Sequence, residues 1–380
     1  MAQPKKQQDV FAPWTDETQN PLIEFKNVTK KFGEFTAIDD LNLKIYEKEF
    51  FALLGPSGCG KTTLMRMLAG FETPTTGQIH LAGQDIAAVP PNKRPVNMMF
   101  QSYALFPHLS VWDNIAFGLR RSDMAKDAIG PRVEEMLRLT RMEKFARRKP
   151  HQISGGQRQR VALARSLAKA PKLLLLDEPL GALDKKLRTE TQFELMDIQE
   201  KTGTTFVIVT HDQEEAMTVA SRVAVMDHGK LIQVATPADI YEYPNSTYVA
   251  DFIGDVNLIE GRVTNVADGK CEVTYGEGLS PINAANPESG SLGMNVTFAI
   301  RPEKIVVGTE PDNTRANAVK GKIEDIGYLG NISTYHVRLD SGHLISAQMT
   351  NSRRLARRDY TWDDEVWLSW TDTAGVVLTQ

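Results

Sequence analysis

The sequence has few cysteines and no basic excess. It contains 2 cysteines in 380 residues, Cys59 and Cys271, which is too few for a disulfide framework and fits a reducing compartment. The formal net charge is -4, whereas a general nucleic-acid-binding protein usually carries an excess of Lys and Arg. We therefore expect no nucleic-acid partner and no fold held together by disulfides.

Long apolar runs are also lacking. The best stretches, FFALL at residues 50–54 and LLLL at 173–176, are far shorter than the roughly 20 residues that cross a bilayer as a helix. Residues 1–21 contain no apolar core of the secretory type, and we expect them to form a disordered lead. The expectation is a soluble or peripheral protein whose membrane role comes through a partner.

What is present is a change of pattern along the chain. Residues 22–245 alternate apolar strand-like runs with helical periodicity, which predicts an α/β domain with a parallel sheet, and residues 102–170 read as a helical insertion. Residues 246–380 are short alternating segments broken by Gly, Asn and Asp, which predicts an all-β accessory domain of small-barrel type. Within residues 332–339 the odd-numbered side chains should share one face, and DSG at 340–342 supplies a turn.

Residues 55–62, GPSGCGKT, match the pattern G-x-x-x-x-G-K-[ST] in full. In such a phosphate loop the backbone N–H groups cradle phosphates, Lys61 reaches the β and γ phosphates, and the Thr62 hydroxyl ligates Mg²⁺. The alternative, a structural glycine turn, explains the strand before and the helix after less well. We expect Cys59 to act through its backbone and not as a nucleophile. The candidate nucleotide-binding residues are Gly55, Pro56, Ser57, Gly58, Cys59, Gly60, Lys61, Thr62 and Thr63.

Two carboxylates follow the apolar run at residues 173–176. Asp177 and Glu178 come at the carboxyl end of a predicted strand, where open α/β sheets bind ligands. Asp177 suits Mg²⁺ and Glu178 suits a general base that activates water, although a solvated strand end is the simple alternative. His211 ends a second apolar run, and a lone histidine is more often structural.

Residues 153–160, ISGGQRQR, precede a strongly helical run. Ser154 and Gln157 have the spacing of a capping box, which needs no ligand. A capping box does not need Gly155 and Gly156, which weaken a helix, whereas close approach of an anion to the helix start explains them. Residues 154–157 therefore favour a bound anion at this helix start, and a plain capping box stays open as the alternative.

GPSGCGKT, ISGGQRQR, LLLLDEP and VTHD, in that order, resemble the nucleotide-binding subunits of ATP-binding-cassette (ABC) transporters. The resemblance covers residues 22–245. It implies that Gln101 forms the Q-loop, with a catalytic and metal-contacting role, and that Asp184 in GALD forms the D-loop. It also implies that Phe32 stacks on adenine, where the family often has Tyr.

The same resemblance implies ATP and Mg²⁺ as cofactors. It gives Asp177 as the Mg²⁺ site, Glu178 as the catalytic base and His211 as the switch that contacts the γ-phosphate. Such subunits work as head-to-tail pairs, so Ser154, Gly155, Gly156 and Gln157 would serve the nucleotide of a second copy of the chain. The implied partners are two membrane-spanning permease subunits and, indirectly, a periplasmic substrate-binding protein. The implied location is the cytoplasmic face of the bacterial inner membrane.

The all-β segment at residues 246–380, called the β tail below, indicates which group of importer ATPases the chain resembles. FIGDVNLIEG, AIRPEKI and the stretch from residue 327 to 348 resemble the OB-like, TOBE-type accessory domain of sugar and polyamine importer ATPases. The whole chain looks most like the putrescine-importing branch, while spermidine, iron and sugar importers share the plan. A small-molecule kinase has no use for SGGQ, and a soluble ABC ATPase would show two cassettes or coiled coils. The β tail is either structural packing or a regulatory element, and the basic run 352–358 should be a solvated face.

Overall fold

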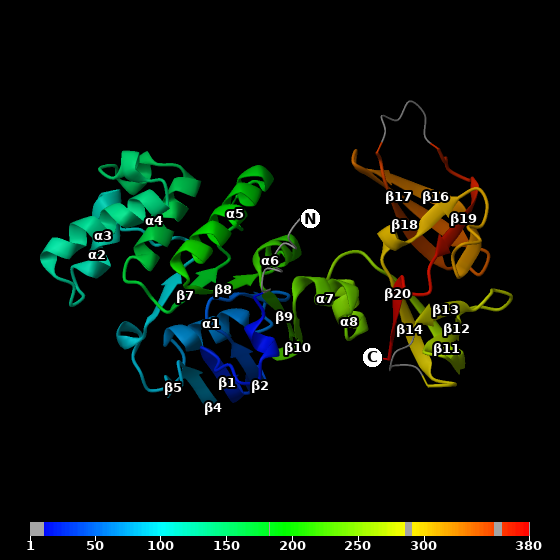
Figure 1. Cartoon of the computed structure of the whole chain (residues 1–380), viewed down its shortest axis with the longest axis horizontal. Helices are drawn as coiled ribbons and strands as arrows, with labels where there is room; N and C mark the ends of the chain where they lie inside the picture. The colour runs from blue at the N-terminus through cyan, green and yellow to red at the C-terminus, as the bar shows by residue number, and fades with distance from the viewer. Residues whose placement is uncertain (1–10, 182, 286–290, 353–358, 380) are drawn as a thin grey trace, which may run out of the picture. The chain divides into compact units, whose positions relative to one another are not determined.

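The computed structural model describes residues 11–181, 183–285, 291–352 and 359–379 (Figure 1). The chain divides into two units, and the second begins at Ala238. The expected disordered lead falls outside the described residues at 1–10, and so does the basic run at 353–358. No helix among the described ranges has both the length and the apolar character needed to cross a bilayer.

The first unit contains the predicted parallel sheet. Five neighbouring strands run parallel and a sixth pairs with one edge in the antiparallel sense. Four of these strands are buried along nearly their whole length, as continuous apolar runs predict. The order across the sheet is β10 (Lys230–Ala235), β9 (Arg222–Asp227), β3 (Phe50–Leu54), β8 (Thr205–Thr210), β7 (Leu173–Asp177) and β6 (Val96–Met99).

A second, antiparallel sheet lies in the same unit. Its order is β2 (Phe35–Ile45), β1 (Ile23–Phe32), β4 (Thr76–Leu81) and β5 (Gln84–Asp85). Helix α1 (Lys61–Ala69) lies between the two sheets and shares one apolar core with both (Figure 1). Leu64 and Leu68 enter this core at helical spacing, and Gly70 ends the helix in the left-handed conformation, as the sequence indicates.

A helical block and two further helices complete the unit. The block contains α2 (Val111–Leu119), α3 (Lys126–Leu139) and α4 (Gly155–Leu167), which pack on one another within the predicted helical insertion (Figure 1). Helices α5 (Lys185–Thr202) and α6 (Gln213–Val219) follow β7 and β8. Short 3-10 turns occupy η1 (Pro13–Thr15), η2 (Pro91–Lys93), η3 (Glu143–Phe145) and η4 (Pro150–Gln152).

The described part of the expected disordered lead is packed. Trp14 in η1 lies over the Arg222 guanidinium, 4.9 Å from ring centroid to guanidinium carbon, and Arg222 in turn pairs with the buried Glu49 at 2.8 Å. An aromatic ring over a cation gains attraction where water is partly excluded. Residues 11–21 were expected to be disordered, but Trp14 packs on the Arg222 side chain of β9 and holds this segment in place.

The second unit is all β after two short helices, α7 (Pro237–Glu242) and α8 (Thr247–Phe252). Contacts assign nearly all of α7 to this unit, so the division falls before the expected boundary at residue 245. One antiparallel sheet has the order β13 (Ile282–Ala285), β12 (Lys270–Thr274), β11 (Asn257–Ala267), β14 (Asn295–Ile300) and β20 (Gly375–Leu378). The other has the order β15 (Val306–Gly308), β19 (Glu365–Trp370), β16 (Asn317–Tyr328), β17 (Ile332–Leu339) and β18 (Leu344–Thr350), with η5 (Pro302–Lys304) before it.

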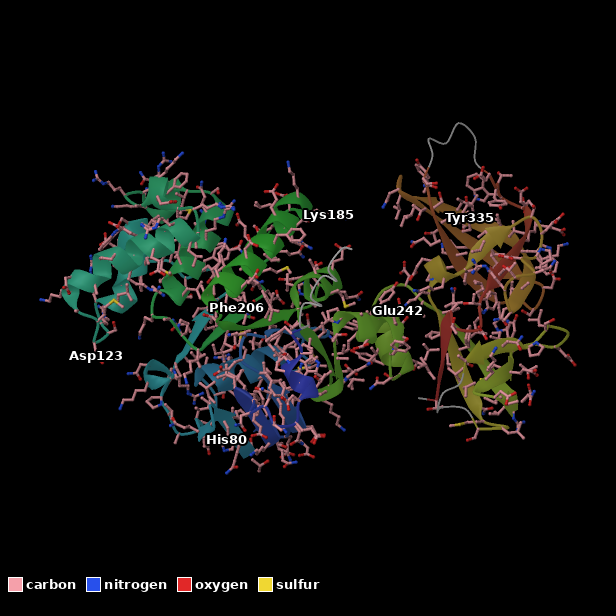
Figure 2. All side chains as sticks on the ribbon, in the orientation of Figure 1. His80, Asp123, Lys185, Phe206, Glu242 and Tyr335 are labelled. Carbon is pink, nitrogen blue, oxygen red and sulfur yellow. The ribbon has the colours of Figure 1, made fainter. Side chains whose placement is uncertain are left out.

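Both sheets of this unit close on one core. Phe298 from β14 and Trp370 from β19 are fully buried in it. On β17 the side chains Ser333, Tyr335 (labelled in Figure 2), Val337 and Leu339 are buried, and residues 340–342 turn the chain into β18, as predicted. The alternation of side chains along a strand explains why this face could be read from the sequence.

Candidate active site

The phosphate loop, residues 55–62, joins the carboxyl end of β3 to α1. A Cβ on Gly55 would lie 2.3 Å from the Met226 carbonyl oxygen, and one on Gly60 would lie 2.6 Å from that of Ala37. Gly60 also has φ +106°, in the region that side chains disfavour. The fold of this chain therefore requires glycine at both positions.

Lys61 is turned inward over this loop. Its ammonium donates to the carbonyl oxygens of Gly55 at 2.7 Å and Pro56 at 2.8 Å, and the residue is 6% exposed. Cys59 is buried beside it, and burial raises the pKa of its thiol above the usual value. A thiol that stays protonated is a poor nucleophile, which agrees with a backbone role for Cys59.

Helix α1 begins without a side-chain cap. Gly60 is its N-cap residue and supplies no side-chain acceptor, so the first N–H groups of the helix keep their hydrogen-bonding capacity. Thr62, in the first turn, is exposed, and Thr63 is half-buried. Unpaired N–H groups and the positive end of the helix dipole together favour an anion at this point.

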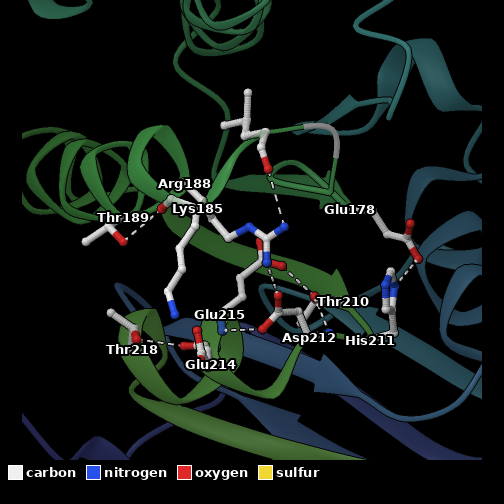
Figure 3. A network of polar contacts seen from close by, with 11 residues as sticks. Glu178, Lys185, Arg188, Thr189, Thr210, His211, Asp212, Glu214, Glu215 and Thr218 are labelled. Carbon is white, nitrogen blue, oxygen red and sulfur yellow. Dashed lines mark hydrogen bonds and ion pairs between the residues drawn. The ribbon is translucent and has the colours of Figure 1, made fainter. Parts of the chain in front are cut away.

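Three predicted catalytic side chains meet at the carboxyl ends of the parallel strands. Glu178 follows β7 and accepts from Gln101 Nε2 at Oε2 over 3.0 Å. On its other side His211 Nδ1, at the end of β8, lies 3.0 Å from Glu178 Oε1 (Figure 3). Because an ionised carboxylate only accepts, the imidazole N–H donates. Glu178 is thus held between two side chains from neighbouring strands.

Strand register brings these ends together. Leu54 pairs with Thr210, and Asp177 pairs with Val209, so the phosphate loop, the carboxylates and His211 start from the same edge. Burial raises the pKa of the Asp177 carboxyl, the charge of Glu178 raises it further, and Arg66 and Lys61 oppose both. The cations that oppose the shift come from α1, which places Asp177 beside the phosphate loop.

Ser154 and Gln157 form the capping box that their spacing predicts. Ser154 Oγ accepts from Gln157 N at 3.3 Å, and Ser154 N donates to Gln157 Oε1 at 2.9 Å. A Cβ on Gly155 would meet only Arg158, at 3.8 Å, and one on Gly156 would lie 3.4 Å from Leu187. Within the described residues, the hydrogen bonds of residues 154–157 do not reach the phosphate loop or Glu178.

Two further predicted residues have no described contact with Glu178, Gln101 or His211. Asp184 caps α5, where its Oδ1 accepts from Leu187 N at 3.0 Å, and residue 182, two positions before it, is outside the described residues. Phe32 ends β1 and is 46% exposed, with the Lys30 ammonium 4.7 Å from its ring centroid. An exposed ring of this kind can stack on a planar base.

Sequence reasoning missed a polar network next to His211. Arg188 on α5 pairs with Asp212, which directly follows His211 and caps α6 by accepting from Glu215 N at 3.1 Å (Figure 3). Glu215 is 2% exposed and accepts from Thr210 Oγ1 at 2.5 Å, and burial raises its pKa to about 7. The only signal in the sequence was the D-x-x-E spacing of a helix start.

Comparison with known families gives two matches. The ABC transporter family matches residues 38–181, and the TOBE domain family matches residues 298–378. The putrescine transport ATP-binding protein PotG of Escherichia coli is 53% identical over 96% of this chain and 97% of its own length. The spermidine/putrescine import ATP-binding protein PotA of Rubrobacter xylanophilus is 50% identical over 90% of each.

The chain therefore belongs to the family of ABC transporter ATP-binding proteins, and its first unit is an ATP-binding domain. Its place within that family is among the polyamine-import ATP-binding proteins. The expected order of an ABC ATPase domain followed by a TOBE-type β domain is confirmed.

Solved structures agree with the cassette fold. One is an ATP-binding cassette solved as a dimer in a post-hydrolysis state with ADP and Pi, 33% identical with a TM-score of 0.50 over 57% of this chain and 98% of its own. Another is cbiO1 from Clostridium perfringens, part of the ABC transporter complex cbiONQ, 28% identical with a TM-score of 0.55 over 58% of this chain and 91% of its own.

Proposed function

We propose that this chain is the ATP-hydrolysing, energy-coupling subunit of a bacterial importer for polyamines, putrescine and spermidine above all. The observation that carries the catalytic part is Glu178, held at 3.0 Å by both Gln101 and His211 beside the phosphate loop. The substrate part is supported by relatives whose names state putrescine or spermidine/putrescine import.

Glu178 is the general base in this proposal. Its side chain is partly exposed, and its two oxygens each contact one donor, so a water beside it has an oriented acceptor. A base must lie within hydrogen-bond reach of the proton that it takes, and fixing its orientation favours that geometry. Gln101 and His211 position the carboxylate, and His211 also contacts the terminal phosphate.

The phosphates bind along residues 55–63 and the first turn of α1. Lys61, now on the Gly55 and Pro56 carbonyl oxygens, would exchange these neutral acceptors for anionic phosphate oxygens, which bind an ammonium more strongly. The exposed ring of Phe32 is the proposed platform for the adenine.

Mg²⁺ fits the oxygen groups beside this loop. In the described ranges no group of three or more His, Cys, Asp or Glu side chains could hold a metal by itself. Mg²⁺ normally combines one or two protein oxygens with phosphate oxygens and waters, and Thr62, Asp177 and Gln101 supply hydroxyl, carboxylate and amide oxygens. When bound it would neutralise charge on the β and γ phosphates.

The complete site is proposed to need two copies of the chain in head-to-tail contact. Each nucleotide would lie between the phosphate loop of one copy and residues 154–157 of the other, with Asp184 also at that contact. Two findings support this: a related cassette was solved as a dimer with ADP and Pi, and the fold of this chain does not itself require Gly155.

The remaining partners follow from the import role. Two membrane-spanning permease subunits would bind the pair of ATPase subunits, and a periplasmic binding protein would deliver the polyamine to them. This places the chain at the cytoplasmic face of the inner membrane as a peripheral protein. The relatives that carry transport or import in their names support the assignment.

Glu178→Gln is the direct test of the catalytic part. We expect the rate constant for ATP hydrolysis to fall by about 10² to 10⁴, the usual contribution of a positioned acid or base, while ATP binding persists. The matched control is Glu190→Gln, which changes an exposed carboxyl on α5. Near-normal hydrolysis by Glu178→Gln would remove Glu178 from the mechanism.

Uptake of labelled putrescine tests the substrate. Cells that lack the gene and the other polyamine systems would be complemented with the wild type or with Glu178→Gln. We expect uptake only with the wild type. If the deletion leaves putrescine uptake unchanged, the ABC ATPase assignment stands and the substrate is wrong, and spermidine is the next compound to measure.

A further inference from the structure

His211 depends on its neighbours in the chain for its position. Its side chain is 58% exposed, and Glu178 Oε1 is the one contact described for its ring. An exposed ring with a single hydrogen bond has freedom to leave, because fixing a side chain costs conformational entropy. The orientation of His211 must therefore come from residues 210 and 212, which the structure holds firmly.

Residues 210 and 212 are anchored from two sides. Thr210 is 1% exposed, and its hydroxyl accepts from Asp212 N at 2.9 Å while donating to Glu215. Asp212 receives Glu215 N on one oxygen and the Arg188 guanidinium on the other. Each anchor lies in β8, α6 or α5, so three elements converge on the backbone that carries His211 (Figure 3).

Arg188 also reaches the segment before α5. Its second terminal nitrogen donates to the Leu183 carbonyl oxygen at 3.4 Å, next to Asp184. A guanidinium is a planar fork with fixed donor directions, so one side chain can bind a carboxylate and a carbonyl at once. Arg188 thus connects the segment that carries Asp184 with the carboxylate that follows His211.

We propose that Arg188 and Asp212 are positioning residues for hydrolysis: their ion pair fixes residues 210–212 and thereby holds His211 against Glu178. The inference rests on the proposed roles of Glu178 and His211. It adds that loss of the pair should lower the rate of the chemical step without weakening ATP binding, because neither side chain lies in the phosphate loop.

Asp212→Asn is the sharpest variant. Asn is as good an N-cap as Asp, so the bond from Glu215 N and the stability of α6 should remain, while the charged partner of Arg188 is lost. We expect kcat for ATP hydrolysis to fall by at least about tenfold with KM unchanged, as small misplacements of catalytic groups do. The unfolding temperature should stay close to that of the wild type.

Arg188 gives a graded second series. Arg188→Gln should lower kcat as Asp212→Asn does, and Arg188→Lys should recover part of it because the charge returns without the fork. The matched control is Glu194→Gln, which breaks the pair with Arg160. That pair has similar side-chain exposure, 29% and 22% against 29% and 24%, but it joins α4 to α5 and has no described bond to residues 210–212. Glu194→Gln should keep the wild-type kcat.

A His211→Ala background separates the inference from the function on which it rests. If the pair acts through His211, adding Asp212→Asn to His211→Ala causes no further loss of kcat. Wild-type kcat in His211→Ala overturns the role of His211 and the inference with it. A low kcat in His211→Ala together with wild-type kcat in Asp212→Asn overturns the inference alone. A kcat in the double variant that is lower than in His211→Ala also overturns the inference alone.

Discussion

Two glycine-rich segments begin helices in the ATPase unit, and they differ in what their glycines are for. In the phosphate loop, a side chain on Gly55 or Gly60 would collide with backbone atoms, and Gly60 has a positive φ. At the start of α4, a Cβ on Gly155 would make only an ordinary contact with Arg158 at 3.8 Å, its φ is not positive, and Ser154 already caps the helix. The first pair of glycines is required by the chain itself.

The second pair is not explained by the chain itself. A capping box stabilises a helix with any small residue at its first positions, and glycine there is less favourable than alanine. What remains is close approach by something outside the fold, as the proposed nucleotide of a second copy would provide. Gly55 and Gly60 therefore serve the fold of this chain, whereas Gly155 and Gly156 are proposed to serve contact with a second copy. Three substitutions test this difference.

Gly60→Ala should have the largest effect. A Cβ 2.5 Å from Ile38 and 2.6 Å from the Ala37 carbonyl oxygen, at φ +106°, combines a backbone clash with a strained conformation. We expect the free energy of unfolding to fall by about 2 kcal/mol or more, with loss of nucleotide binding. Chemical denaturation measures the first and fluorescent ATP titration the second. Wild-type stability would show that the loop relaxes without its glycine.

Ser154→Arg should lower stability less than Gly60→Ala does, and it should strongly lower ATP hydrolysis. Loss of the N-cap costs about 1 kcal/mol, and a bulky cation at the proposed contact should abolish hydrolysis. ATP binding to the isolated chain should persist, because residues 154–157 have no described bond to the phosphate loop. Loss of ATP binding by the monomer would instead make this segment part of the chain's own site.

Gly155→Ala should have the smallest effect on stability. Alanine replaces glycine in the first turn of a helix with room for its methyl, so the free energy of unfolding should stay the same or rise by up to about 1 kcal/mol. Hydrolysis should nevertheless fall. A loss of stability as large as that expected for Gly60→Ala would contradict the distinction between the two segments.

Much of the site could be predicted because its chemistry is local. The phosphate loop occupies adjacent residues, and Asp177, Glu178 and His211 each end an apolar strand whose parallel neighbours were readable from their composition. The contact of Glu178 with Gln101 joins residues 77 apart in sequence. The resemblance implied a role for each residue but did not predict that they touch.

The rest depends on packing between distant segments. Arg188 and Asp212 are 24 residues apart, and their pairing requires α5 to lie against the start of α6. Trp14 contacts Arg222 because η1 packs against β9. The described part of the N-terminal segment is therefore packed where disorder was expected. Neither contact has a sequence spacing that reveals it, since tertiary neighbours are set by the whole fold.

The most direct test of the composite site mixes two inactive variants, Lys61→Ala and Ser154→Arg, and measures ATP hydrolysis by the mixture. If each site combines the phosphate loop of one copy with residues 154–157 of the other, a mixed pair contains one site with both halves intact. We expect the mixture to hydrolyse ATP faster than the sum of the two variants alone. A mixture as inactive as its components would show that both segments act within one chain, and it would contradict the head-to-tail account.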